Sequence, residues 1–138
     1  MKIKLDPQKK NIAIDFDGVI HKYSRGWQDG LIYDKPITGS RRNIETLAKK
    51  YNIIIFSRRA AEQSIKPIAT WLKKNKIPYS EITGEKPRAK WYIDDQAIHF
   101  TNWPGVMVEL KKLDAEYAIK KRKEGFPSGN KKPRTRKD

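Results

Sequence analysis

The sequence predicts a three-layer, Rossmann-like α/β domain with a mainly parallel central sheet, and three observations lead to this class. A length of 138 residues is enough for one hydrophobic core and too short for two ordinary ones. Residues 11–16 and 52–56 are near-continuous apolar runs rich in isoleucine, which is typical of strands covered on both faces. Helical and strand-like segments alternate along the chain, and this order favours a parallel sheet covered by helices.

Local patterns define the remaining strands and turns. Between the first strand and the first helix, residues 18–39 have room for a short hairpin flap, with its turn at Asp29-Gly30. Short strands are expected at about 79–82 and 91–94. The chain shows no internal repeat.

Three helices are expected. The first spans residues 40–51, with Ser40 available as its cap, and the second begins near Pro67, which suits the first turn of a helix. The third is expected at about 106–122. Helical spacing directs several apolar side chains of the first two helices to the core, namely Ile44, Leu47, Ala48, Tyr51, Ile68, Trp71 and Leu72.

The composition excludes several kinds of site. Without cysteine the chain has no disulfide framework, thiolate metal site or thiol nucleophile, and two histidines disfavour a zinc site. The amino terminus, MKIKLDPQKK, lacks the apolar segment of a secretion signal, and the longest apolar run, residues 53–56, is too short to span a bilayer. We therefore expect a cytoplasmic protein without a membrane partner.

The charge is strongly basic, with 31 Lys and Arg against 16 Asp and Glu and a formal net charge of +15. Residues 120–138 hold nine basic and two acidic residues among Gly, Pro and Ser, which predicts a disordered basic tail after a domain at residues 1–119. Such a tail either aids solubility or serves as an arm for the phosphate backbone of a nucleic acid.

Five polar residues fall at the carboxyl ends of the expected strands, where ligands bind in parallel sheets. They are Asp15, Asp17, Ser57, Asp94 and Asp95. The adjacent like charges of Asp94 and Asp95 require a cation or a proton nearby, and ligands that are all oxygen suit Mg²⁺. Gly18 would let the chain turn sharply and bring backbone groups close to an anion.

Four segments resemble, in order, the four motifs of the haloacid dehalogenase-like hydrolase superfamily. These are DFDGVI at 15–20, the strand-end serine of IIIFS at 57, a lysine at 86 or 90, and IDD at 93–95. The resemblance covers roughly residues 11–100. It implies that Asp15 is a nucleophile that forms an aspartyl-phosphate, and that Asp17 is the general acid/base.

The resemblance also implies the phosphate and metal ligands. The Asp15 carboxylate, the backbone carbonyl of Asp17 and a carboxylate of Asp94 or Asp95 would hold Mg²⁺. Ser57 and a lysine would bind the phosphoryl group. Lys86, which precedes proline and lies eight residues before Asp94, is preferred to Lys90.

The predicted function is hydrolysis of a phosphate on a nucleic acid or nucleotide at an open site. Members of the superfamily that act on small metabolites usually insert a cap domain, and the segments 18–39 and 58–85 leave no room for one. A small-metabolite phosphatase and a non-catalytic nucleic-acid-binding protein on this fold are the alternatives. Aromatic residues of the flap either stack on a base or pack the flap onto the domain, namely Tyr23, Trp27 and Tyr33. His21 either reaches the site or is structural. The oligomeric state is left open.

Overall fold

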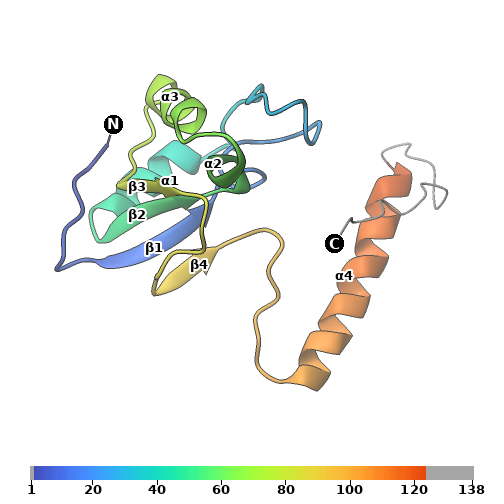
Figure 1. The fold of residues 1–138 in the computed structure, drawn as a ribbon. Helices are drawn as coiled ribbons and strands as arrows, with labels where there is room; N and C mark the ends of the chain where they lie inside the picture. The colour runs from blue at the N-terminus through green and yellow to red at the C-terminus, as the bar shows by residue number, and fades with distance from the viewer. Residues whose placement is uncertain (1, 124–138) are drawn as a thin grey trace. The chain divides into compact units, whose positions relative to one another are not determined.

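The computed structural model describes residues 2–123, which form two compact units, one ending at Asp95 and one beginning at Gln96. The first unit contains a four-stranded sheet with three helices beside it (Figure 1). All strand pairs are parallel, so the α/β class and the parallel sheet are confirmed.

The strand order places β1 in the interior of the sheet. The strands are β1 (Lys10–Asp15), β2 (Tyr51–Phe56), β3 (Glu81–Thr83) and β4 (Trp91–Ile93), in the spatial order β3-β2-β1-β4. Because β2 and β4 lie on opposite sides of β1, the order of the sheet reverses at β1. Such a switch point is where open parallel sheets bind ligands, beyond the carboxyl ends of the strands.

The isoleucine-rich runs are buried on both faces, as predicted. Ile12, Ile14, Ile53 and Ile55 belong to the main core cluster. Side chains alternate along a strand, so Ala13 and Ile54 point to the opposite face, and both are buried there. Continuous burial therefore explains why β1 and β2 lack polar alternation.

The first helix differs from its predicted bounds and cap. Helix α1 spans Ser40–Ala48, and Tyr51 is the first residue of β2. The prediction of Ser40 as the cap was wrong, because Gly39 occupies that position with a left-handed φ of 89°. The Ser40 hydroxyl instead donates to the carbonyl of Ile37 at 2.6 Å. Ile44 is buried as expected.

The second predicted helix is confirmed as α3 (Lys66–Lys74), which has Pro67 in its first turn. Its inward residues Ile68, Trp71 and Leu72 are buried. A short helix that was not predicted, α2 (Arg58–Glu62), precedes it.

The segment 18–39 is only partly the hairpin that was predicted. Its turn is confirmed, because Asp29 and Gly30 both have positive φ and the N–H of Leu31 donates to the carbonyl of Gln28 at 2.9 Å. Within these residues, all of which the structure describes, antiparallel pairing is limited to a bridge between His21 and Pro36.

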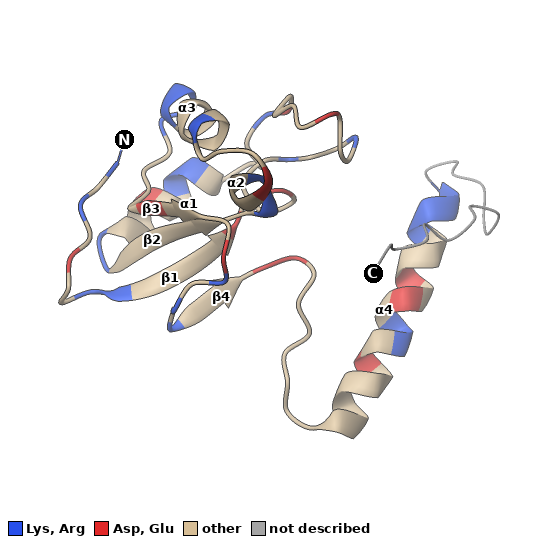
Figure 2. Ribbon diagram, in the orientation of Figure 1, with Lys and Arg blue, Asp and Glu red and all other residues tan. Residues whose placement is uncertain are grey.

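The second unit contains helix α4 (Trp103–Lys123), which begins three residues before the predicted position. Residues 120–123, predicted as the start of the tail, form its last turn, and residues 124–138 lie outside the described residues. Lys and Arg occur on helices, loops and strand ends of the first unit, and in the middle and at the carboxyl end of α4 (Figure 2). Within residues 2–123, no helix is both long and apolar enough to cross a bilayer.

Candidate active site

Parallel pairing brings the predicted site residues to one rim of the sheet. Asp15 is the last residue of β1 and pairs in register with Phe56, so Ser57 follows directly on the neighbouring strand. On the other side Ile14 pairs with Ile93, so Asp94 follows next to Asp15. The rim therefore gathers three segments that are distant in the sequence.

Three carboxylates form a cluster on this rim. Asp15, Asp94 and Asp95 each offer an oxygen atom, and these atoms lie within 4.8 Å of one another. Burial, followed by the negative charge of Asp94, raises the pKa of Asp15 from 3.8 to about 7. A cation between these oxygens would offset the repulsion, so the donor set fits a hard metal ion.

Gly18 makes room for one carboxylate of this cluster. A Cβ atom at Gly18 would overlap the carboxylate of Asp95, and its φ of 84° also favours glycine. The tight turn after β1 was predicted from this glycine. Its close approach to Asp95 could not be predicted, because it depends on how β4 pairs with β1.

The side chain of Asp17 lies in a different set of contacts. One carboxylate oxygen accepts a hydrogen bond from His21 Nδ1 at 2.8 Å, and the other accepts one from Arg59 Nε at 2.7 Å. Burial of Asp17 disfavours its charged form, but these two hydrogen bonds and the Arg59 charge outweigh it and hold the pKa of Asp17 below its usual value. The Asp17 carboxylate is therefore ionised, and the hydrogen bonds from His21 and Arg59 hold its two oxygens in place.

The ring of His21 is completely buried and has a defined tautomer. The backbone N–H of Asp34 donates to Nε2 at 3.0 Å, so Nε2 carries the lone pair and Nδ1 carries the hydrogen donated to Asp17. Phe16 stacks on the ring, and Tyr33 and Trp71 meet it edge-on. His21 thus contacts the predicted acid/base through its side chain and is also part of the core.

Ser57 links the rim to α2. Its side chain is buried and caps the helix, accepting a hydrogen bond from the N–H of Arg59 at 3.2 Å. The hydroxyl hydrogen of Ser57 stays available for an acceptor such as a phosphoryl oxygen. Gly84 permits this arrangement, since a Cβ atom there would overlap the backbone of Ala61 in α2.

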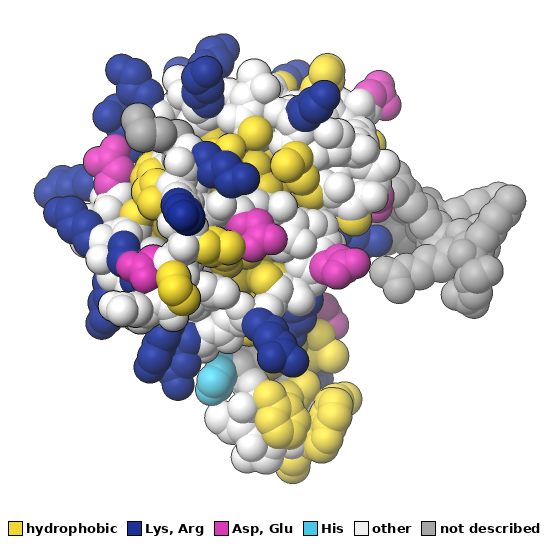
Figure 3. Space-filling model, turned by 60° about the vertical axis from the view of Figure 1, so that its left-hand side comes forward, with side chains coloured by type: hydrophobic (Ala, Val, Ile, Leu, Met, Phe, Trp, Pro, Cys, Tyr) yellow, Lys and Arg dark blue, Asp and Glu magenta, His cyan; other side chains and the backbone are white. Residues whose placement is uncertain are grey.

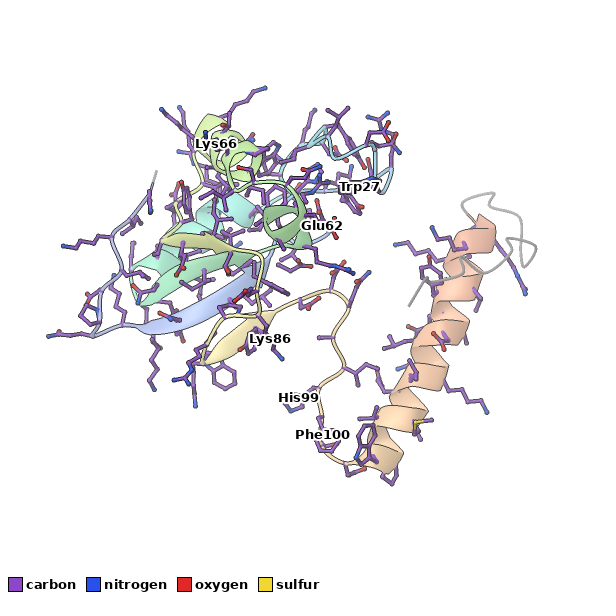
Figure 4. The ribbon with its side chains drawn as sticks, in the orientation of Figure 1. Trp27, Glu62, Lys66, Lys86, His99 and Phe100 are labelled. Carbon is purple, nitrogen blue, oxygen red and sulfur yellow. The ribbon has the colours of Figure 1, made fainter. Side chains whose placement is uncertain are left out.

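The two lysine candidates lie over aromatic rings of β4. The ammonium of Lys86 is 5.0 Å from the centre of the Tyr92 ring, and that of Lys90 is 5.2 Å from the Trp91 ring. Both side chains are exposed, and Figure 4 shows Lys86 on the segment that leads into β4. The choice of Lys86 over Lys90 stays a prediction.

Sequence reasoning assigned no role to Arg59, which is only 3% exposed. Besides Asp17, its guanidinium contacts the carbonyl of Gly30 through Nη1 at 2.8 Å and lies 4.9 Å from the centre of the Trp27 ring. Figure 4 shows Trp27 on the 18–39 segment beside α2. The sequence signal for Arg59 was only its position two residues after Ser57.

No family model, curated protein or solved structure matches this chain. The arrangement of the rim must therefore carry any functional conclusion.

Proposed function

We propose that this chain is a Mg²⁺-dependent phosphohydrolase with a three-layer, haloacid dehalogenase-like domain, without a cap domain, that acts through an aspartyl-phosphate intermediate. The observation that carries the proposal is the cluster of Asp15, Asp94 and Asp95 at the switch point of the sheet, with the Ser57 hydroxyl following the adjacent strand. Three neighbouring carboxylates repel one another unless a cation or a proton lies between them. A bound metal ion would offset this repulsion and would account for the cluster.

In the first step, an Asp15 carboxylate oxygen attacks the phosphorus atom and forms an acyl phosphate. The bond from phosphorus to the leaving oxygen breaks, and that oxygen takes a proton from Asp17. Asp17 is ionised without substrate, but the negative charge of an arriving phosphate raises its pKa and favours the protonated form that this step needs. The Ser57 hydroxyl donates to a phosphoryl oxygen.

In the second step, the Asp17 carboxylate takes a proton from water. The water oxygen bonds to phosphorus, the acyl phosphate bond breaks, and inorganic phosphate and the Asp15 carboxylate result. The paired hydrogen bonds from His21 and Arg59 suit this step, because they hold Asp17 ionised and in place.

The residues that would hold Mg²⁺ are Asp15, Asp94 or Asp95, and the backbone carbonyl of Asp17. When bound, the ion screens the repulsion between carboxylate and phosphate. Lys86 is the proposed second source of positive charge for the phosphoryl group.

The proposed substrate is a phosphate on a nucleic acid or nucleotide, because the chain carries a net charge of +15. Figure 3 shows Lys and Arg side chains spread over one face of the molecule rather than gathered in one place. Such a distribution attracts phosphate backbones without reading a sequence.

The test is phosphate release from a panel of 3′- and 5′-phosphorylated oligonucleotides, nucleotides, sugar phosphates and phosphopeptides. Wild type is compared with Asp15→Asn and with the matched control Glu62→Gln, which changes an exposed carboxylate on α2. Asp15→Asn should abolish turnover, Glu62→Gln should leave it unchanged, and a chelator should stop it.

The panel also separates the alternatives. Preference for sugar phosphates would favour the small-metabolite phosphatase. Oligonucleotide binding without turnover of any member of the panel would favour the non-catalytic binding protein.

A further inference from the structure

Arg59 contacts both the proposed acid/base and the 18–39 segment. It belongs to α2, yet its side chain reaches back to the Asp17 carboxylate and to the 18–39 segment. We propose that Arg59 is a positioning residue that fixes the Asp17 carboxylate for proton transfer and ties its placement to the observed conformation of residues 18–39. This inference rests on the proposed function only for its kinetic part.

The hydrogen bonds of Arg59 join two segments through one rigid group. Nε donates to Asp17 and Nη1 donates to the carbonyl of Gly30, at the turn of the segment. Because the guanidinium is planar, movement of Gly30 away from Nη1 and rotation of Asp17 away from Nε disturb the same group. The two contacts therefore depend on each other.

Aromatic rings complete this contact with the segment. The Arg59 guanidinium carbon lies 4.9 Å from the centre of the Trp27 ring and 5.6 Å from that of Tyr23. Trp27 is 49% exposed, so its ring covers the guanidinium on one side and meets solvent on the other. Opening of the segment would remove Trp27 and Gly30 from Arg59 together.

One donor of Arg59 supports a role beyond stability. Nη2 is buried and has no hydrogen-bond partner among residues 2–123. A buried arginine retained for stability alone is expected to have its donors satisfied, because an unpaired buried donor is unfavourable. Arg59 is therefore buried despite one unsatisfied donor, while Nε and Nη1 are bonded to Asp17 and Gly30.

The kinetic test uses the leaving group of the substrate. A leaving alkoxide needs a proton from Asp17 as its bond to phosphorus breaks, whereas a nitrophenolate leaves without one. Arg59→Lys should lower the rate of the first step, measured as the pre-steady-state release of the leaving group, by about tenfold to a hundredfold for an alkyl phosphate and by less than about threefold for p-nitrophenyl phosphate. The control Arg58→Lys, at a side chain that is 86% exposed, should leave both rates unchanged.

Asp17→Asn provides the reference for this first-step pattern, because it removes the proton donor itself. Its second step is blocked for both substrates, since the base is missing too. If Arg59→Lys lowers the first-step rate equally for both substrates, or lowers it for neither, the positioning role is refuted and Arg59 merely supports the fold.

Hydrogen exchange of residues 25–33 tests the coupling without any need for activity. Asp17→Asn leaves Arg59 in place but weakens its bond to residue 17, so amide exchange in this segment should accelerate by about tenfold, as Arg59→Lys should also do. Unchanged exchange in a folded Asp17→Asn protein would overturn the coupling.

The kinetic test and the hydrogen-exchange test can be interpreted independently of each other. If wild type turns over no phosphate ester, the proposed function fails, while exchange still decides whether Arg59 couples Asp17 to the segment. If Arg59→Lys does not fold, Arg59→Gln takes its place, because Asp17→Asn also alters the contact of Asp17 with His21 of the same segment.

Discussion

Asp15→Asn should stabilise the metal-free protein at pH 8, although Asp15 is the proposed nucleophile. The folded state holds the Asp15 carboxylate half-buried beside Asp94 and Asp95, and this raises its pKa from 3.8 to about 7. Asparagine removes the charge and keeps an oxygen that can accept the hydrogen bond from the Phe16 N–H at 2.9 Å. The substitution therefore removes repulsion without removing that contact.

The magnitude follows from the pKa of Asp15. A rise from 3.8 to about 7 corresponds to about 4 kcal/mol, at about 1.4 kcal/mol for each pH unit. Because the carboxyl group is only half-buried, solvent screening reduces the expected gain to about 1–2 kcal/mol.

The pH dependence has a defined sign. Between pH 4 and pH 7 folded wild type binds more protons at Asp15 than the unfolded chain does, so its stability falls as pH rises through this range. The gain of Asp15→Asn should be near zero at pH 4 and complete at pH 8.

The assay is urea unfolding of both proteins in chelator at pH 4, 6 and 8. The difference between the two proteins cancels the titration of groups that do not interact with Asp15. A variant that is less stable than wild type at pH 8, or a gain that does not change with pH, would refute the carboxylate cluster. Added Mg²⁺ should stabilise wild type more than the variant.

Three further predictions concern the core, the glycines and the tail. Leu72→Ala, at a fully buried position of α3, should lower the free energy of unfolding by about 2–4 kcal/mol in urea titration. In thermal melts, Gly84→Ala should lower the stability more than Gly26→Ala. A Cβ atom at Gly84 would overlap the backbone of α2, whereas at Gly26 it would meet open space, and only the positive φ of 65° disfavours alanine there. Residues 124–138 hold five basic and two acidic residues, so their removal should make oligonucleotide affinity fall less steeply with rising salt. Equal salt dependence of affinity in the full-length and truncated proteins, measured by fluorescence anisotropy, would exclude a tail that binds phosphates.

The site residues that could be predicted from the sequence are those that lie at or directly after the carboxyl end of a strand. Asp15 and Asp94 follow apolar runs, and parallel pairing necessarily brings such ends to one edge of a sheet. Pro67 and the inward face of α3 were predictable for a similar reason, since helical periodicity and proline chemistry act locally.

The parts that sequence did not predict depend on contacts between distant segments. Helix α2 has five residues, too few for a periodic pattern, and it needs the Ser57 cap and the space left by Gly84. Arginine is usually solvated, and Arg59 is buried only because its partners Asp17 and Gly30 come from elsewhere in the chain. The wrong cap at Ser40 shows the limit of local rules, because the left-handed Gly39 took that position.

In the proposed mechanism Asp15 becomes phosphorylated during turnover, and rapid acid quenching followed by peptide mass spectrometry detects the phosphorylated residue. Asp17→Asn is the best protein for the measurement, since it lacks the base that activates water and should accumulate the intermediate when an activated aryl phosphate is supplied with Mg²⁺. One phosphoryl group is expected on the peptide that contains Asp15, and none in Asp15→Asn. Phosphate release by wild type, together with a phosphoryl group found on another residue or on none in the Asp17→Asn protein, would contradict the proposed mechanism.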